Sequence, residues 1–390
     1  MANKFYNSSD KHIRICHVQL LSILSGVQRA MLEILYRLNP QVYEPIVLCK
    51  EEGDLTIELS AHNIAYITMP ELVRPISPWH DIRSYYSLKK FFSERRFDIV
   101  HTHSSKTGIL GRFAAHHAGV PIIFHTVHGL PFHEFSPYIN KLLYSVIENR
   151  AASVSQKIIF VNQEERALAI SKKIIPEEKT ITICNGVDLQ KVGCYDNEQA
   201  RMVFRQRWSI DKDDYVIGYV GRLWEQKDPE TLLRTIELCN DLPVRFLIVG
   251  DGPYKERFDQ HFENDKRVIM TGWLDNPISI YPAIDALILP SLWEGLSVTL
   301  IEAMAFGKPL IASNIKGNRE CVWHGENGFL CTPRDPYSFR QAIATLTGDK
   351  ALYKRMSVSG REKAAAHFDA EKNSQKVITL YEQELTKLGK

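Results

Sequence analysis

The sequence predicts two doubly wound parallel α/β units in tandem. Short runs rich in β-branched residues alternate with longer amphipathic stretches, which is typical of parallel sheets covered by helices. This alternation restarts after residues 185–200, so we place the boundary between the units there. A chain of 390 residues is long enough for two or three domains, each with a sizeable core.

The expected strands form two sets. Those of the first half are 13–18, 46–49, 99–102, 122–126 and 158–161. Those of the second half are 216–220, 246–249, 268–270, 287–289 and 310–312. Ligands bind at the carboxyl ends of the strands in open α/β sheets, so two such units facing each other would form a cleft lined by both sets of loops.

The composition excludes several classes of protein. A hydrophobic fraction of 44% and a charged fraction of 24% are ordinary for a globular protein, and a net charge of +2 gives no sign of nucleic-acid binding. No apolar run approaches the roughly 18 residues of a membrane helix. The polar N-terminus lacks a signal peptide, and the seven cysteines form no Cys-x2-Cys pair; both features favour the cytoplasm.

Residues 290–307 are the most informative segment for function. They are expected to form a strand end, a polar loop with Glu294, and a helix that carries Glu302, is capped by Ser297 and is stopped by Gly307. Free N–H groups and the positive end of the helix dipole suit a diphosphate there. The backbone groups concerned belong to Gly295, Leu296, Ser297 and Val298.

The two carboxylates would flank this anion and accept hydrogen bonds from the hydroxyls of a nucleotide-sugar. The alternative is an ordinary strand-to-helix turn with two unrelated glutamates.

A basic pair and a glycine extend the candidate site. Arg222 and Lys227 follow a strand end, where two positive charges could neutralise a diphosphate leaving group. A solvated arginine and a surface lysine are the alternative. In the first half, Gly26 lies between a strand and a helix expected to begin near Val27, and its missing side chain would let the backbone approach a phosphate.

These motifs, in this order, resemble those of glycosyltransferase family 4, which contains retaining enzymes of the GT-B fold. The shared features are Glu-x7-Glu and Gly-Arg followed by a lysine, with further matches at 185–188, 249–253, Gly26 and 125–129. The resemblance covers nearly the whole chain. One mild departure is Ser25-Gly26, where relatives often carry two glycines.

The resemblance implies a division of labour between the domains. It assigns the acceptor to an N-terminal domain, 1–190, and the nucleotide-sugar to a C-terminal domain, 191–370. A helix at 371–390 would pack back on the first domain. The donor would be a co-substrate, UDP-sugar first and GDP-mannose second, and no cofactor or metal would be needed.

The resemblance also implies roles for single residues. Arg222 and Lys227 would hold the diphosphate, which itself takes the acceptor proton. Glu302 would bind the ribose hydroxyls and Glu294 the sugar hydroxyls near C3. His128 matches the acceptor-side histidine of the family. We further expect Trp273 to lie near the base.

Histidines are concentrated in the first half, which holds 11 of the 14. They include His101, His103, His116, His117, His125, His128 and His133. A zinc cage is the competing interpretation, but no spacing matches a known zinc frame. We therefore expect no metal and several histidines lining the cleft.

Two aromatic segments suggest contact with a membrane surface. Residues 87–97 are basic and aromatic, and 131–138 add aromatic residues beside His128. A solvated helix face and an ordinary loop explain them equally well. The run 125–133 resembles family members that extend lipid-linked glycans in bacterial polysaccharide assembly, which implies a peripheral enzyme at the inner membrane surface.

Two other classes of function stay open. A nucleotide-sugar epimerase or hydrolase on the same architecture would consume the donor without an acceptor. A sugar-binding or metal-binding module would bind without turnover.

Overall fold

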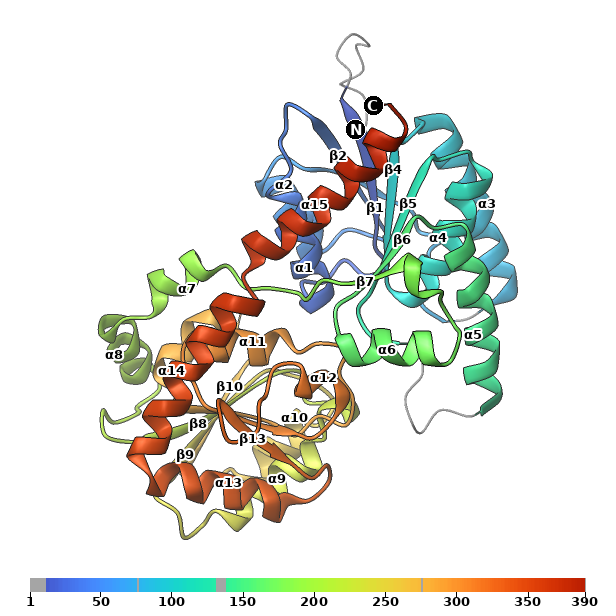
Figure 1. The fold of residues 1–390 in the computed structure, drawn as a ribbon. Coiled ribbons are helices and arrows are strands. Elements are labelled where there is room, and N and C mark those ends of the chain that lie inside the picture. Colours follow the sequence, from blue (N-terminus) through green and yellow to red (C-terminus); the bar gives the residue numbers. More distant parts are fainter. Residues whose placement is uncertain (1–11, 76, 131–137, 275, 390) are drawn as a thin grey trace. The chain divides into compact units, whose positions relative to one another are not determined.

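The computed structural model describes residues 12–75, 77–130, 138–274 and 276–389 (Figure 1). They form two compact units. The N-terminal unit extends to Val161 and also contains Arg166–Ile183 and Ser374–Lys390. The C-terminal unit contains Asn162–Glu165 and Cys184–Asn373. The divisions thus fall a few residues from the limits 190 and 370 that we expected, and the short segment 162–165 belongs to the other unit.

The N-terminal unit is built on a seven-stranded parallel sheet in the order β3-β2-β1-β4-β5-β6-β7. Its strands are β1 Ile13–Val18, β2 Tyr43–Cys49, β3 Ala65–Thr68, β4 Ile99–His103, β5 Ile122–Val127, β6 Lys157–Phe160 and β7 Thr180–Thr182. The helices between them are α1 Gly26–Leu35, α2 Asp54–Ala61, α3 Pro78–Arg95, α4 Ser105–His117, α5 Tyr138–Ser153, α6 Gln163–Ser171 and the 3₁₀ turn Glu177–Lys179.

Apolar side chains cover both faces of this sheet. On one face, residues of β1, β2 and β5 pack with α1, α2 and the last helix, α15 Ala370–Lys387, which contributes Val377, Ile378, Tyr381 and Leu385. On the other face, residues of the same sheet pack with α3 and α4. The last helix is therefore part of the core of this unit.

The C-terminal unit has a six-stranded parallel sheet in the order β10-β9-β8-β11-β12-β13. Its strands are β8 Tyr215–Val220, β9 Val244–Val249, β10 Val268–Gly272, β11 Ala286–Leu289, β12 Leu310–Ser313 and β13 Gly328–Cys331. Its helices are α7 Leu189–Tyr195, α8 Glu198–Arg207, α9 Pro229–Leu238, α10 Lys255–His261, α11 Val298–Ala305, α12 Lys316–Arg319, α13 Pro336–Gly348 and α14 Lys350–His367, with 3₁₀ turns at Glu225–Lys227 (η2) and Pro277–Ala283 (η3).

All ten expected strands are present, which confirms the prediction of two parallel α/β units. Three further strands were missed: β3, β7 and β13, each at an edge of its sheet. They contain three or four residues, and most of these residues are only partly buried. Their apolar runs are therefore too short and too mixed to identify from the sequence.

The strand order determines which loops lie side by side at the carboxyl edge of each sheet. In the C-terminal sheet the order reverses between β8 and β11, so the loops that follow these two strands begin side by side at one edge. In the N-terminal sheet the same reversal lies between β1 and β4. Among the described helices, none has the length and apolarity that a membrane span requires. All seven cysteines are free thiols, and five are buried.

Candidate functional site

Lys227 is held rigidly at the carboxyl end of β8. It is the last residue of the turn η2, and its N–H donates to the carbonyl of Trp224 at 2.9 Å. The next residue, Asp228, adopts a left-handed conformation and caps α9, where its carboxylate accepts from Thr231. Pro229 then begins the helix with a residue that has no N–H to satisfy. The turn, the helix cap and the proline together fix the backbone conformation on either side of Lys227.

Glu294 lies in the loop after β11 and contacts Lys227 directly. The ammonium nitrogen of Lys227 lies 2.5 Å from Oε1 of Glu294, and the Ser291 hydroxyl donates to the same oxygen at 2.7 Å. The side chains are only 14% and 8% exposed, respectively, so this ion pair is shielded from solvent. Neither bond uses the other carboxylate oxygen, Oε2. The two residues predicted from separate motifs are therefore brought together.

A glycine on the next strand-to-helix connection holds this loop in place. A Cβ at Gly317, in α12, would lie 2.4 Å from the carbonyl oxygen of Glu294, a distance that real Cβ atoms do not show. The amide of Gln226 also donates to the carbonyl of Trp293 at 2.8 Å, which ties the β8 loop to the β11 loop. The backbone on both sides of the ion pair is thus closely packed.

Helix α11 begins and ends as predicted. Ser297 is its N-cap, with its hydroxyl accepting from the N–H of Leu300, and Gly307 follows in the left-handed conformation. Glu302 is buried within the helix, and its carboxylate accepts from the hydroxyl of Tyr281 at 2.6 Å. Tyr281, in η3, is fully buried, so Glu302 is oriented by a rigid partner.

The backbone candidates at the start of α11 lie where the sequence placed them. Gly295 and Val298 are partly exposed, whereas Leu296 and Ser297 are buried. The first N–H groups of a helix have no carbonyl partner within the helix. An anion at this end of α11 could therefore accept hydrogen bonds from them.

Arg222 and Trp273 are the more exposed candidates. The Arg222 guanidinium lies over the ring of Trp224, 5.3 Å from its centroid, and the Arg222 carbonyl accepts from Tyr219. Trp273 directly follows β10 and is 62% exposed. Both residues are at carboxyl ends of strands, but β10 is the edge strand, two positions from β8.

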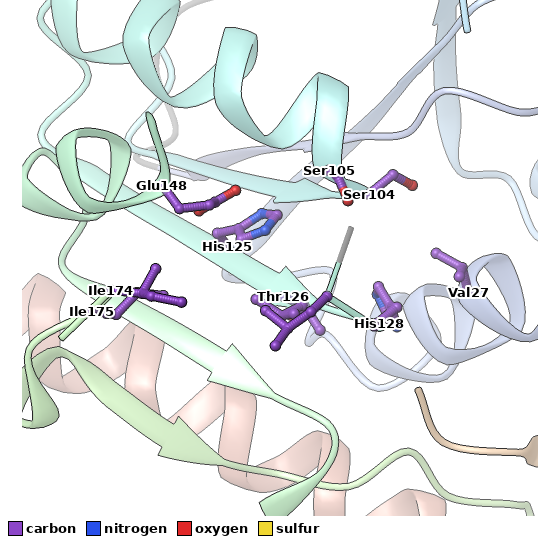
Figure 2. A pocket seen from close by; sticks show the side chains of 12 residues that line it. Val27, Ser104, Ser105, His125, Thr126, His128, Glu148, Ile174 and Ile175 are labelled. Carbon is purple, nitrogen blue, oxygen red and sulfur yellow. The ribbon is translucent and has the colours of Figure 1, made fainter. Parts of the chain in front are cut away.

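The N-terminal unit contains a small cavity beside His128 (Figure 2). Its volume is about 170 Å³. In Figure 2, His125 lies beside Glu148 at one end and His128 lies toward Val27 at the other. Other lining residues are Ser104, Ser105, Thr126, Val127, Gly129, Leu130, Ile174 and Ile175. The lining thus combines apolar side chains with hydroxyl, imidazole and carboxylate groups, and ligand pockets commonly pair apolar walls with such polar groups.

Gly26 immediately precedes Val27, a residue that lines this cavity. Gly26 is the first residue of α1, one position earlier than expected. Gln28, three residues after the N-cap Ser25, reaches back to the N–H of Ser25 at 3.3 Å and closes the start of the helix. The structure therefore brings the neighbourhoods of Gly26 and His128 together in the N-terminal unit.

A buried ion pair forms part of the cavity wall. Glu148 of α5 lies 2.7 Å from the guanidinium of Arg112 in α4, and the Arg112 side chain is fully buried. Burial and the nearby Arg112 charge both hold the pKa of His125 well below its usual range. His125 is therefore neutral at the cavity wall.

Several histidines are not where we expected them. His101 and His103 are fully buried and do not line the cavity, whereas His125 lines it although this residue is only 2% exposed. Side-chain direction alternates along β4, so His101 and His103 point to the same face of the sheet, where His101 contacts Tyr381 of α15. His116 and His117 lie on the exposed surface of α4, and His133 lies outside the described residues.

Three buried histidines lie close enough to be considered as metal ligands. His17, His101 and His103 have ring nitrogens within 4.8 Å of one another. Both ring nitrogens of His101 already have partners, the Tyr381 hydroxyl and Thr126 Oγ1, and both nitrogens of His103 lie near other histidines. An ion here would have to displace these contacts, so the donor set fits hydrogen bonding better than metal binding.

The predicted aromatic surface at 87–97 is largely wrong. Phe92 and Phe97 are buried in the core, and Phe91 is packed against it. The exposed apolar residues of α3 lie nearer its beginning: Trp79, Ile82 and Tyr86. Residues 131–137 of the second segment lie outside the described chain.

Comparison with known proteins decides the family. The family model "Glycosyl transferases group 1" matches residues 201–363, and "Glycosyltransferase Family 4" matches 24–191. An Escherichia coli protein named UDP-Gal:alpha-D-GlcNAc-diphosphoundecaprenol alpha-1,3-galactosyltransferase is 38% identical over 382 residues, which is 96% of this chain and 98% of the relative. The chain belongs to glycosyltransferase family 4. It is therefore a glycosyltransferase.

More distant relatives agree with this family assignment. A Campylobacter jejuni N,N'-diacetylbacillosaminyl-diphospho-undecaprenol alpha-1,3-N-acetylgalactosaminyltransferase is 23% identical over 79% of this chain and 83% of its own length. The crystal structure of Anabaena HepE in complex with UDP has a TM-score of 0.80 at 20% identity, covering 95% of this chain and all of that one. At this identity the likeness shows the fold alone, and the fold is GT-B.

Sequence reasoning missed four residues that shape these sites. Tyr281, Ser291 and Gly317 support Glu302 and Glu294, and His17 approaches His103. Serine three residues before a glutamate carries no distinctive signal, and the other contacts depend on strand order. None of these four could be recognised from spacing alone.

Proposed function

We propose that this family 4 enzyme is a retaining transferase that moves a hexose or N-acetylhexosamine from a UDP-sugar to a lipid-linked glycan. The observation that carries the proposal is the shielded contact between Lys227 and Glu294, beside the start of α11. It combines a cation and a carboxylate at the carboxyl ends of β8 and β11, where ligands bind in such sheets.

The C-terminal unit would hold the donor. Lys227, Arg222 and the N–H groups of residues 295–298 would bind the diphosphate, because positive charge and free donors both stabilise it. Glu302, oriented by Tyr281, would accept from the ribose hydroxyls. Glu294 would accept from a sugar hydroxyl through Oε2 while Oε1 stays bonded to Lys227 and Ser291. Trp273 would lie near the base.

The chemistry would need no metal. As the bond from the sugar to the diphosphate breaks, negative charge grows on the leaving oxygen, and Lys227 and Arg222 would stabilise that charge. The same diphosphate oxygen would take the proton of the attacking acceptor hydroxyl on the same face of the sugar. The configuration at the anomeric carbon would then be retained.

The choice of donor and acceptor rests on relatives. The names of the E. coli and C. jejuni proteins both specify an alpha-1,3 linkage and an undecaprenol diphosphate acceptor, and the former specifies UDP-galactose. An alpha product from an alpha-linked UDP-sugar requires retention. We therefore propose UDP-galactose as the first candidate for the donor. GDP-mannose is the second candidate.

An apolar helix face in the N-terminal unit supports contact with a membrane surface. On α5, Ile139, Leu142, Leu143 and Val146 follow helical spacing and are between 43% and 74% exposed. Helix α3 presents Trp79, Ile82 and Tyr86, together with the exposed basic residues Arg83 and Lys90. Helix α4 contacts both α3 and α5, and the three helices lie on the same side of the sheet (Figure 1).

The occupant we propose for this surface is an anionic lipid headgroup layer. Apolar side chains flanked by lysine and arginine bind such interfaces by combining area burial with charge attraction. A lipid-linked acceptor would have to be met at this layer. The enzyme would then act as a peripheral protein at the inner membrane surface.

Ligand-induced stabilisation tests the donor site. Purified protein would be melted with UDP, GDP, ADP or CMP, alongside a Glu302→Ala variant. A ligand at 100 times its dissociation constant adds about 2.7 kcal/mol, which shifts the midpoint by a few degrees. We expect UDP to shift the native protein and to shift Glu302→Ala much less. A shift by GDP alone would replace UDP with GDP, and no shift at all would contradict the donor site.

Transfer is tested with UDP-galactose and a GlcNAc-diphospho-lipid acceptor, with and without EDTA. We expect an alpha-linked product and the same rate in EDTA. Donor consumption without an acceptor product would favour the epimerase or hydrolase alternative. A beta-linked product would contradict retention.

A further inference from the structure

Three histidine rings form one continuous chain in the N-terminal unit. They come from β1, β4 and the residue after β5, and these three strands are neighbours in the sheet. Nδ1 of His17 lies 3.1 Å from Nε2 of His103, and Nδ1 of His103 lies 3.1 Å from Nε2 of His128. His103 is thus the middle member and uses both of its nitrogens.

Each of these imidazoles is neutral near pH 7. Burial lowers the pKa of His17 to about 3 and that of His128 to about 4, and burial with neighbouring histidines holds the pKa of His103 well below its usual range. A neutral imidazole has one N–H and one lone pair. Since His103 donates through one nitrogen and accepts through the other, the direction of one hydrogen bond fixes the direction of the other.

The two ends of the chain differ. Nε2 of His17 and Nδ1 of His128 have no hydrogen-bond partner within the described ranges. One end must therefore carry an N–H and the other a lone pair. A buried N–H without a partner is rarer than a buried acceptor without one. Both of these nitrogens are shielded from solvent, but the His128 ring lines the cavity and His17 does not. We therefore place the N–H at His128, the end of the histidine chain that is nearer to a ligand in the cavity.

The middle ring is held in its orientation. The ring of His101 stacks on that of His103, with centroids 4.4 Å apart and planes at 26°. His101 is itself fixed by Thr126 Oγ1 at 2.7 Å and by the hydroxyl of Tyr381. A flip of His103 would exchange its nitrogens for carbons and break both contacts of the chain. The chain therefore transmits the hydrogen-bond direction reliably.

We propose that His103 and His17 are positioning residues that keep the proton of His128 on Nδ1, so that His128 donates a hydrogen bond to a sugar oxygen. In this role His128 is a donor and not a base, which agrees with a reaction in which the leaving diphosphate takes the acceptor proton. The identity of the oxygen rests on the proposed function, whereas the tautomer does not.

Nuclear magnetic resonance of protein with 15N-labelled histidine tests the chain without any substrate. Correlations between ring nitrogens and ring carbon-bound protons distinguish the two tautomers and the charged form. We expect the proton on Nδ1 in His17, His103 and His128 at pH 7. A proton on Nε2 of His128, or a charged His128, would overturn the proposal.

A matched pair of variants tests the direction of the chain. The amide of His17→Asn can place an N–H where Nδ1 of His17 lies, whereas an ionised His17→Asp can only accept there. We expect His17→Asn to keep the His128 proton on Nδ1 and turnover within about threefold of the native enzyme. His17→Asp should move that proton to Nε2 and lower kcat at least about tenfold, with the shift by UDP unchanged.

Equal turnover and the same His128 tautomer in both variants would contradict the relay. If His17→Asp does not fold, the spectra of the native protein and His17→Asn still decide. Stoichiometric zinc on His17 and His103 would also overturn the proposal, because a metal would take the lone pairs that the chain uses. If the native protein shows no transfer, the proposed function fails while the tautomers can still be read.

Discussion

Among single residues, Lys227 should have the largest effect on catalysis. Its ammonium group is shielded, fixed by its contact with Glu294 and placed at the end of β8. Replacing Lys227 by Ala should lower turnover by about a hundredfold or more, as expected for loss of one group that stabilises developing charge. Steady-state kinetics with UDP-galactose would measure this.

Lys255→Ala provides a matched control for this variant. Lys255 is a surface lysine on α10 that also contacts a carboxylate, Asp259, but it is about one third exposed. Its removal should leave turnover unchanged. Because Lys227→Ala also leaves Glu294 without its cation, the urea midpoint of both variants should be recorded to separate stability from catalysis. An unchanged rate for a folded Lys227→Ala would remove Lys227 from the site.

The buried histidines should also make stability depend on pH. The pKa of His17 is about 3 in the folded protein, below its ordinary value of 6.5, so the unfolded chain binds a proton that the folded chain does not. The free energy of unfolding should therefore fall as pH drops from about 6.5 toward 3, by up to about 1.4 kcal/mol per pH unit for each such group. His101, His103, His125 and His128 act in the same direction.

Urea unfolding at pH 7, 6, 5 and 4 would measure this dependence. His17→Asn lacks one titrating group, so its stability should fall less steeply than that of the native protein. If the free energy of unfolding depends on pH in the same way in both proteins, His17 takes up a proton equally readily in the folded and the unfolded state. His62, which is exposed on the surface beside α2, is a suitable control position for His→Asn.

At the scale of helices and strands, the exposed face of α5 should control binding to vesicles. Leu142 and Leu143 are 53% and 59% exposed, and replacing both by Glu removes apolar area and adds charge that anionic lipid repels. Because a buried leucine contributes about 1.5–3 kcal/mol, we expect at least a tenfold loss of binding. Sedimentation with anionic vesicles at low salt would measure it.

Ile57→Glu is the control for this change. Ile57 is 70% exposed on α2, which packs on the other face of the sheet from α3 and α4. This variant should sediment like the native protein, and both should retain stabilisation by UDP. No sedimentation of the native protein at low salt would contradict the membrane contact itself.

Some helices and contacts could be predicted from the sequence alone, and others could not. Helix α11 and the loop before it were predicted because the helix cap, the helix stop, Glu294 in the loop and Glu302 in the helix are all local signals. The exposed face of α3 was not, because Phe91 and Phe92 look like surface aromatics until the sheet beneath them is known. Likewise, His17 and His103 are 86 residues apart, and only the strand order β1-β4-β5 brings them together. Local signals therefore predicted the elements that we propose to bind the donor, whereas the contacts among the histidines depend on pairing between distant strands and could not be predicted.

At the scale of the whole molecule, the chain enters the N-terminal unit again at Ser374, so its last helix completes a core that begins at residue 13. Tyr381 is fully buried there, and its ring lies 5.1 Å from that of Phe124. Tyr381→Ala should cost about 3–5 kcal/mol, as large-to-small core changes do. The exposed Val358 of α14, in the C-terminal unit, offers the control Val358→Ala.

The distribution of tryptophans allows the affected unit to be identified. Trp79 belongs to the N-terminal unit, whereas Trp208, Trp224, Trp273, Trp293 and Trp323 belong to the C-terminal unit. Fluorescence therefore reports mainly on the C-terminal unit, and far-ultraviolet circular dichroism reports on both. In Tyr381→Ala, part of the dichroism should be lost at lower urea while the fluorescence midpoint and the shift by UDP change little. If the urea midpoints measured by circular dichroism and by fluorescence fall by the same amount, the two units unfold together.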